Sequence, residues 1–302
     1  MRPLPALALA ILLAPATTLA DDASVVREIV FVGNDTTEPG TMLREMTVHV
    51  AEPADPEQVE RSRQAIQDLG LFRSVEVSEV PVPGGVRLVF TVKEKYYLIP
   101  SPRADTNSDG QYSYGVQLRW YNAFGLNHTA KATLKYNNRQ AAGRGTALEF
   151  DASYAVPFID GTPYGVEVSS SHVTEPVEAP APYDEVRDSA RLLVSRSLAR
   201  HIASQGWRVG AGLQWQRQKV SGDGAPPAQG TATALVLTAG FQDVRHNIYS
   251  EEGQRGGLEF VGTVDEHLSD YDYNTLTAEY DGSWYVGEAK HQSVALFAKA
   301  GA

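Results

Sequence analysis

The 302-residue chain contains no cysteine, so neither a disulfide-stabilised scaffold nor a thiolate metal site is possible. Basic residues are also too few for a nucleic-acid partner. The formal net charge is −11, whereas nucleic-acid-binding surfaces are strongly basic. Beyond residues 1–20, no apolar run is long enough to cross a membrane as a helix. These absences exclude disulfide-rich secreted, nucleic-acid-binding and helical membrane proteins.

Sequence motifs of catalysis are missing too. The seven histidines include no His-Glu-x-x-His pattern. The chain also has no Gly-x-Ser-x-Gly elbow, P-loop or dinucleotide-binding fingerprint. We therefore expect no enzymatic activity, no cofactor and no resident metal ion.

Residues 1–20 have the composition of a secretory signal peptide. Arg2 is followed by an apolar run from Leu4 to Pro15, and small residues precede Asp21. This run is too short for a transmembrane helix. We therefore expect export from the cytoplasm and a mature chain that begins near residue 21.

The segment that follows has the pattern of a small α+β domain. Residues 27–32 alternate charged and apolar side chains and predict a strand. A short helix is predicted around Met42. A second helix is predicted to begin with Asp55 as its cap and Pro56 as its first residue, and to end at Gly70.

Two further strands complete the predicted domain. Residues 75–80 form the first of them, a turn at 83–85 reverses the chain, and residues 86–92 return as a hairpin partner. The predicted order is βααββ, and the predicted domain covers residues 21–95. Its predicted core consists of Ile29, Phe31, Ile66, Leu69, Phe72, Val75, Leu88 and Phe90.

From residue 96 to 302 the hydrophobic pattern has a period of two. In residues 148–158 the even-numbered side chains are apolar or aromatic, whereas Glu149, Asp151 and Ser153 are polar. Soluble strands usually have about 5–6 residues, and the longer strands here suit the ~9–11 residues that cross a bilayer. A soluble β-sandwich is the alternative, and the strand length favours an antiparallel transmembrane β-barrel. The side chains predicted to face lipid are Leu148, Phe150, Tyr154, Val156 and Phe158.

The connections support a barrel. Turns at alternate ends differ in length, as long external loops and short periplasmic turns do in outer-membrane barrels. The predicted external turns are residues 107–110, 138–145, 174–186, 221–230 and 266–273. The predicted opposite turns include residues 123–125, 159–162 and 287–290, with one long exception over residues 241–252. The pattern predicts about eleven strands, and since single-chain bacterial barrels have an even number, we expect further strands after residue 302.

Three motifs resemble those of one protein family. Residues 31–34, Phe-Val-Gly-Asn, and residues 69–77, Leu-Gly-Leu-Phe-Arg-Ser-Val-Glu-Val, resemble the signature of a POTRA domain. Residues 92–95, Val-Lys-Glu-Lys, resemble the junction between the last POTRA domain and the barrel in the BamA/TamA family of outer-membrane proteins. A third motif, with Asp243, Arg245 and Asn247, resembles a periplasmic-rim motif of that family. It departs from the family pattern at Ile248, where a proline usually stands.

The resemblance implies a bacterial outer-membrane protein with a periplasmic POTRA domain. It implies assembly, insertion or translocation of unfolded outer-membrane or secreted clients, with the lipid bilayer and periplasmic or inner-membrane proteins as further partners. Two alternatives stay open. One is a passive channel or surface antigen without insertase activity, and the other is the transporter of a two-partner secretion system.

The resemblance also assigns roles to strand edges. A client strand is expected to pair with exposed POTRA edges. The predicted client-binding residues are Ile29, Phe31, Val75, Val77 and Val80. The first barrel strand, residues 96–106, is expected to form one side of a gate, because Pro100 and Pro102 each remove a hydrogen-bond donor. For Asp243 and Arg245 we expect a salt bridge at the rim or, alternatively, two solvated charges.

Overall fold

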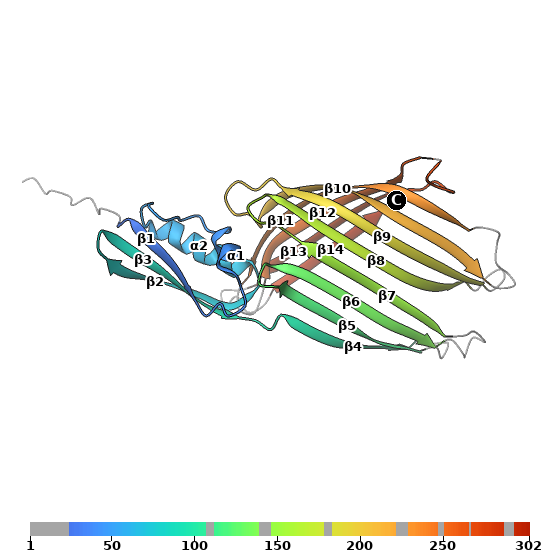
Figure 1. Cartoon of the computed structure of the whole chain (residues 1–302), viewed down its shortest axis with the longest axis horizontal. Helices are drawn as coiled ribbons and strands as arrows, with labels where there is room; N and C mark the ends of the chain where they lie inside the picture. The colour runs from blue at the N-terminus through green and yellow to red at the C-terminus, as the bar shows by residue number, and fades with distance from the viewer. Residues whose placement is uncertain are drawn as a thin grey trace, which may run out of the picture.

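The computed structural model describes residues 24–106, 112–138, 146–177, 183–221, 229–246, 251–265, 267–286 and 293–302. The predicted signal peptide lies outside these residues. The described chain has two parts, a small mixed domain and a large sheet, and the domain lies at one end of the strands of the sheet (Figure 1).

The small domain has the predicted βααββ order. Its elements are β1 (Val26–Val32), α1 (Pro39–Leu43), α2 (Pro56–Asp68), β2 (Phe72–Val82) and β3 (Gly85–Glu94). The three strands form a sheet of order β1-β3-β2, in which β1 is parallel and β2 antiparallel to β3. Both outer strands, β1 and β2, therefore have an edge that the sheet itself leaves unpaired.

The ends of α2 follow the sequence signals. The Asp55 side chain accepts a hydrogen bond from the Glu57 backbone N–H at 3.1 Å, and Pro56 is the first helical residue. Gly70, just beyond the helix, has a φ of +72°, a conformation that favours glycine. Strand β2 is longer at both ends than residues 75–80.

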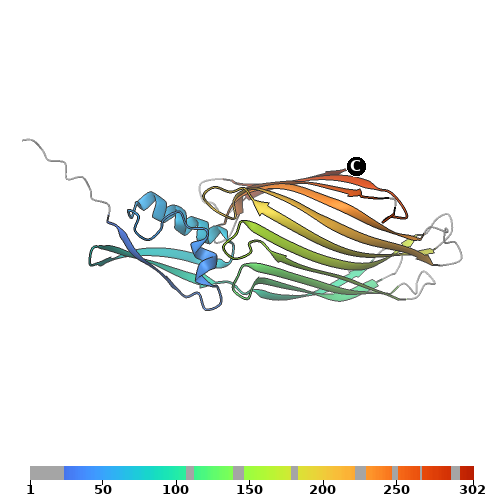
Figure 2. The ribbon, with the colours of Figure 1, turned by 45° about the horizontal axis from the view of Figure 1, so that its top comes forward.

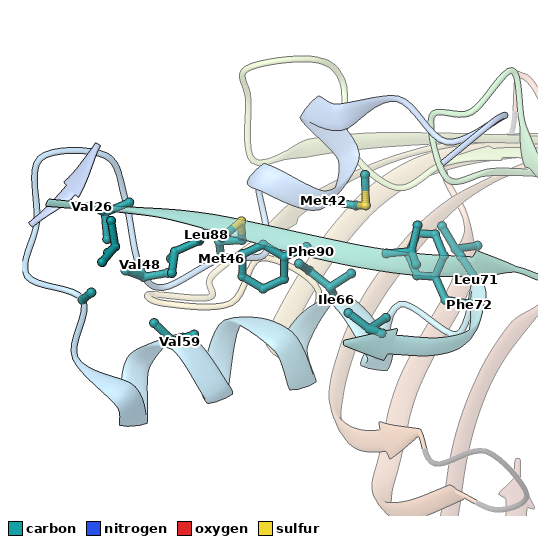
Figure 3. Close-up of a cluster of buried hydrophobic side chains, with 14 residues drawn as sticks. Val26, Met42, Met46, Val48, Val59, Ile66, Leu71, Phe72, Leu88 and Phe90 are labelled. Carbon is teal, nitrogen blue, oxygen red and sulfur yellow. The ribbon is translucent and has the colours of Figure 1, made fainter. Parts of the chain in front are cut away.

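The core of the domain lies between the two helices and the sheet (Figure 3). Of the eight predicted core residues, five are buried, and Ile29, Phe31 and Leu69 are partly buried at its margin. Phe72 and Phe90 are both fully buried, so they contribute the largest apolar area. The buried cluster comprises Val26, Met42, Met46, Val48, Ala54, Val59, Ile66, Leu71, Phe72, Val75, Val86, Leu88, Phe90 and Val92.

The second part is an eleven-stranded sheet in which every strand pairs with its sequence neighbours. All of these pairs are antiparallel. The strands are β4 (Leu98–Thr106), β5 (Tyr112–Ala123), β6 (His128–Asn138), β7 (Ala147–Val156), β8 (Tyr164–Val177), β9 (Tyr183–Ser197), β10 (Gly206–Ser221), β11 (Gly230–His246), β12 (Glu251–Thr263), β13 (Asn274–Tyr285) and β14 (Ser293–Gly301). The predicted number of strands is confirmed.

The sheet is curved and open, as Figures 1 and 2 show. Strands β4 and β14 stand at its two ends, and within the described residues neither has a second strand partner. Only three residues separate the end of β3 from the start of β4, so the domain joins the sheet without a linker. Among the described residues, no helix is long and apolar enough to span a membrane.

The two faces of the sheet differ in polarity, as β10 shows. Trp207 and Leu213 are each 55% exposed on the outer face, whereas Arg208 and Gln214 are half-buried on the inner face. Large apolar side chains thus lie outside and polar ones inside, the pattern of a membrane barrel. Phe158 contradicts the predicted orientation: it follows β7 in a turn, where it is only 5% exposed because two arginines cover its ring.

The predicted long turn over residues 241–252 is also wrong. Strand β11 continues to His246 and β12 begins at Glu251, with Asp243 opposite Gln254 and Arg245 opposite Glu252. Charged and glycine residues favoured a turn, but here they continue the strand ladder, with Asp243 and Arg245 exposed and Val244 buried between them.

Candidate functional site

The edge of β2 is the most accessible edge of the small domain. Near its start, Arg63 Nη1 donates to the Val75 carbonyl at 3.2 Å, so α2 covers that part. From Val77 to Val80, the described residues provide no partner other than β3. Val77 is half-buried, and Val80 is 40% exposed. This stretch can accept another strand.

The edge of β1 is less open. The Val26 N–H donates to the Glu52 carbonyl at 2.8 Å, and the Ala51 N–H donates to the Val26 carbonyl at 2.8 Å, so a loop covers its start. Ile29 and Phe31 are half-buried, and the Phe31 ring lies 5.8 Å from that of Phe90. Val75, on β2, is 4% exposed in the core. Among the five predicted client-binding side chains, Val80 alone is exposed.

Polar contacts fix the domain to the end of the sheet. Thr37 Oγ1 donates to Glu94 Oε1 at 2.6 Å and accepts from Asn122 Nδ2 at 2.8 Å. The Tyr97 hydroxyl lies 3.1 Å from the same Thr37 oxygen and donates to the Leu71 carbonyl at 3.2 Å. Burial raises the pKa of Tyr97 to about 12, so it stays protonated as a donor.

The turn between β5 and β6 forms part of this contact. The Gly125 carbonyl accepts from the Glu38 N–H at 2.9 Å and from Thr41 Oγ1 at 3.0 Å. Gly125 has a φ of +77°, and a Cβ added there would lie 2.1 Å from the Thr36 carbonyl oxygen. Only glycine therefore allows this close approach.

A second contact joins the end of α1 to the turn after β7, the turn before β10 and β10 itself. The fully buried Glu45 carboxylate accepts from the Ser204 N–H at 2.8 Å and pairs with Arg44 at 3.2 Å. Two guanidinium groups lie over the Phe158 ring, with Arg44 Cζ at 4.3 Å and Arg208 Cζ at 4.7 Å from its centroid. These cation–π contacts explain why Phe158 is buried here.

A third contact joins the end of α2 to β11. Asp68 Oδ1 accepts from the His246 N–H at 2.7 Å and from Gln64 Nε2 at 2.7 Å. Asp68 Oδ2 accepts from Gln205 Nε2 at 3.3 Å. Burial raises the pKa of Asp68, although the hydrogen bond from His246 opposes the shift.

A cavity of about 1000 Å³ lies between this third contact and the inner face of the sheet. Asp68 and Leu69 line it from the domain, and charges of both signs line it from the strands. Arg191 on β9 and Glu259 on β12 form an ion pair at 2.7 Å, so the pair spans β10 and β11. The inner wall is thus polar, as in a barrel lumen. The charged strand residues are Glu167, Arg191, Arg208, Arg255, Glu259, Glu279, Asp281 and Lys299.

The predicted gate strand is the end strand β4. Pro100 lies opposite Leu118 and Pro102 opposite Val116 on β5, and both prolines are exposed. Proline within sheets is largely confined to edge strands, where its missing N–H faces away from the ladder. The two prolines therefore suit the open side of β4.

The residues of the rim motif do not come together. Asp243 and Arg245 are both exposed on β11, and within the described part of the chain they form no ion pair with each other. Asn247 lies outside the described residues. Between them in the sequence lies His246, whose backbone N–H contacts Asp68 of the small domain. No local pattern marks its contact with Asp68.

Aromatic side chains gather at both ends of the outer face. Near the small domain, the ring pairs are Trp120–Phe124, His128–Tyr154 and Trp207–Phe241, and Arg196 lies over Tyr164. At the far end, the corresponding contacts are Tyr114–Tyr136, Phe150–His172 and Arg217–Trp215. Two aromatic belts that flank an apolar band are typical of outer-membrane barrels. Among the described residues, no group of three or more His, Asp or Glu side chains could hold a metal ion.

Comparisons with known proteins agree with this architecture. The family model described as "POTRA: Surface antigen variable number repeat" matches residues 24–95. A search of curated proteins found no match. Among solved structures, BamA from Haemophilus ducreyi lacking POTRA domains 1–3 superimposes with a TM-score of 0.59 and 16% identity, over 90% of this chain and 54% of that chain.

Two further solved structures are similar. CdiB from Acinetobacter baumannii gives a TM-score of 0.55 and 10% identity, over 88% of this chain and 50% of that chain. CdiB from Escherichia coli gives a TM-score of 0.56 and 14% identity, over 88% of this chain and 52% of that chain. The chain thus spans about half the length of the structures it matches.

The fold is therefore that of a POTRA domain followed by part of a BamA- or CdiB-type outer-membrane barrel. The predicted fold class, α+β and then an antiparallel barrel sheet, is confirmed. The likeness of the barrel strands is one of fold alone.

Proposed function

We propose that this protein is an assembly, insertion or translocation factor of the bacterial outer membrane, with residues 21–95 in the periplasm and residues 96–302 in the bilayer. The observation that supports this proposal is the accessible edge of β2. Three polar contacts hold the domain that carries this edge against one end of the sheet. An extended client that leaves this edge would next meet the polar inner face of the sheet.

The proposed chemistry is strand addition. Backbone N–H and C=O groups along Val77–Val80 bind an extended client through hydrogen bonds, which depend little on the client's side chains. Pro81 follows and removes the next donor, which limits the length of the added strand. A client of varied sequence is therefore favoured over one small ligand.

The second part of the proposed mechanism is a gate at β4. Client strands pair with the open edge of β4 and bury their apolar side chains in lipid, so neither a nucleotide nor a metal ion is needed as an energy source. The prolines at 100 and 102 keep this edge weakly paired, since each lacks a donor.

A photo-crosslinking experiment tests client binding. A benzophenone amino acid replaces Val80 on the free edge, and in the control it replaces Arg61, which is exposed on α2 away from the edge. We expect crosslinks to unfolded outer-membrane or secreted proteins from position 80 and few from position 61. Equal yields from both positions would contradict edge binding.

Assembly and secretion differ in their clients. The matches to BamA and to CdiB are of similar quality, so both branches fit the fold. Depletion of the protein separates them: lower levels of many outer-membrane barrels indicate assembly, and loss of one secreted protein indicates two-partner secretion. A passive channel or surface antigen would change neither.

A further inference from the structure

The turn between β5 and β6 has a strained backbone. Phe124 has a φ of +60° and Asn127 a φ of +59°, and the preceding Asn122 has a φ of +49°. Asparagine tolerates this left-handed region, but a bulky aromatic residue rarely adopts it. Strain of this kind persists only where surrounding contacts determine the conformation, and it often marks a functional segment.

One side of this turn is fixed by the POTRA domain. The Gly125 carbonyl accepts from Glu38 and Thr41, and the fully buried Asn122 donates to Thr37. Asn122 Oδ1 also accepts from the Asn127 N–H at 2.8 Å, which closes the turn. These contacts explain how the strained backbone is held, but none of them needs an aromatic ring at position 124.

The other side of the turn is apolar and exposed. Phe124 is 64% exposed and Leu126 is 41% exposed. The Phe124 ring lies 4.8 Å from that of Trp120, whose register partner on β4 is the exposed Leu98. The apolar outer face of the strands thus continues onto the turn without a polar break.

The position of this pair matches the aromatic belt at the same end of the sheet. The other members of the belt are His128–Tyr154, Tyr164 with Arg196, and Trp207–Phe241. Rings of this kind mark the level of the lipid headgroups. Phe124 extends the belt from the strands to a turn that also binds the POTRA domain.

We infer that Phe124 and Leu126 insert into the headgroup–acyl boundary of the periplasmic leaflet, and that the turn thereby couples the bilayer surface to the position of the POTRA domain. The occupant of this face is phospholipid, because the face is continuous with the apolar band that the proposed function places in the membrane. The inference rests on that proposed location.

Single cysteines test the insertion, since the chain has none of its own. Cysteine replaces Phe124, Leu118 in the apolar band, or Val80 on the POTRA edge, and each variant carries an environment-sensitive fluorophore. The protein is reconstituted in phosphatidylethanolamine–phosphatidylglycerol vesicles that contain spin-labelled lipid. We expect strong quenching at positions 118 and 124 and little at 80.

The outcomes separate the two claims. Quenching at 118 without quenching at 124 would overturn the inserted turn and leave the membrane location intact. Absence of quenching at 118 would contradict the proposed location itself. Shielding of position 124 from both lipid and aqueous quenchers would assign this face to a protein neighbour and overturn the inference.

The variant Phe124→Gly tests the coupling. Glycine accepts the positive φ, so this change removes the ring without adding backbone strain. Phe124→Trp is the matched control, because it keeps an interfacial ring. In vesicles, we expect hydrogen exchange of the Glu38 amide, which is bonded to Gly125, to rise severalfold in Phe124→Gly and to stay unchanged in Phe124→Trp. Unchanged exchange in both variants would overturn the coupling.

Discussion

The backbone N–H of His246 donates a hydrogen bond of 2.7 Å to the carboxylate of Asp68, across 178 residues of sequence. This bond joins the last turn of α2 in the POTRA domain to the end of β11 in the sheet. Gln205, from the turn before β10, donates to the same carboxylate. One buried side chain of the domain therefore binds two segments of the sheet.

The raised pKa of Asp68 predicts a pH dependence. Because its folded pKa lies above the unfolded value, the folded state binds more protons, and stability increases as the pH falls through the folded pKa. Compared with Asp68→Asn, the wild type should therefore gain stability as the pH falls from neutral toward 3.8, the ordinary pKa of the aspartate side chain. Thermal unfolding of both proteins measures this difference, and a difference that does not vary with pH would contradict the assignment.

The buried core of the POTRA domain predicts a large loss of stability when one of its side chains is truncated. Phe72 is fully buried, so Phe72→Ala should destabilise the domain by about 3–5 kcal/mol. Leu43, which is 42% exposed on α1, is the control, and Leu43→Ala should cost about 0.5 kcal/mol or less. Denaturant unfolding measures both variants. Equal effects would mean that the core is assigned wrongly.

The alternation of β7 predicts opposite responses to charge. Arginine in place of Ala152, on the outer face, should cost roughly 2–4 kcal/mol at the bilayer midplane, and arginine at the inner-face Ser153 should cost much less. Folding titrations in lipid vesicles measure the two costs. A larger penalty at Ser153 would reverse the faces of the sheet.

The prolines of β4 predict a trade between stability and activity. Pro100→Val with Pro102→Val restores two donors on the end strand, and each new hydrogen bond should add about 1 kcal/mol where a partner strand is present. The double variant should resist heat better but support assembly or transport less well. Raised stability with normal activity would show that β4 does not act as a gate.

The parts predicted from the sequence are those that local chemistry determines. The cap at Asp55 and Pro56, the glycine at 70 and the period-two pattern gave the βααββ order and the strands of the sheet. The same local signals failed at residues 241–246, because a strand end rich in charged and polar residues has the composition of a turn.

The interface between the domain and the sheet was not predicted. Phe158 was placed on the lipid face because the alternation of β7 was continued past the end of the strand. No local pattern around His246 indicates that its backbone N–H binds Asp68, and nothing near Gly125 indicates that Glu38 and Thr41 bind its carbonyl. Such contacts join segments far apart in the chain, so they depend on the folded structure rather than on a local pattern.

The central claim is strand addition to the free edge of β2, and hydrogen exchange measures it at the level of the backbone. A peptide with the alternating pattern of a barrel strand is added to the protein, and exchange is followed along β2 and along the central strand β3. We predict that binding slows exchange within Val77–Val80 and leaves Leu88–Phe90 unchanged, since that stretch of β3 already pairs with β1 and β2. Peptide binding without protection of Val77–Val80 would contradict the account.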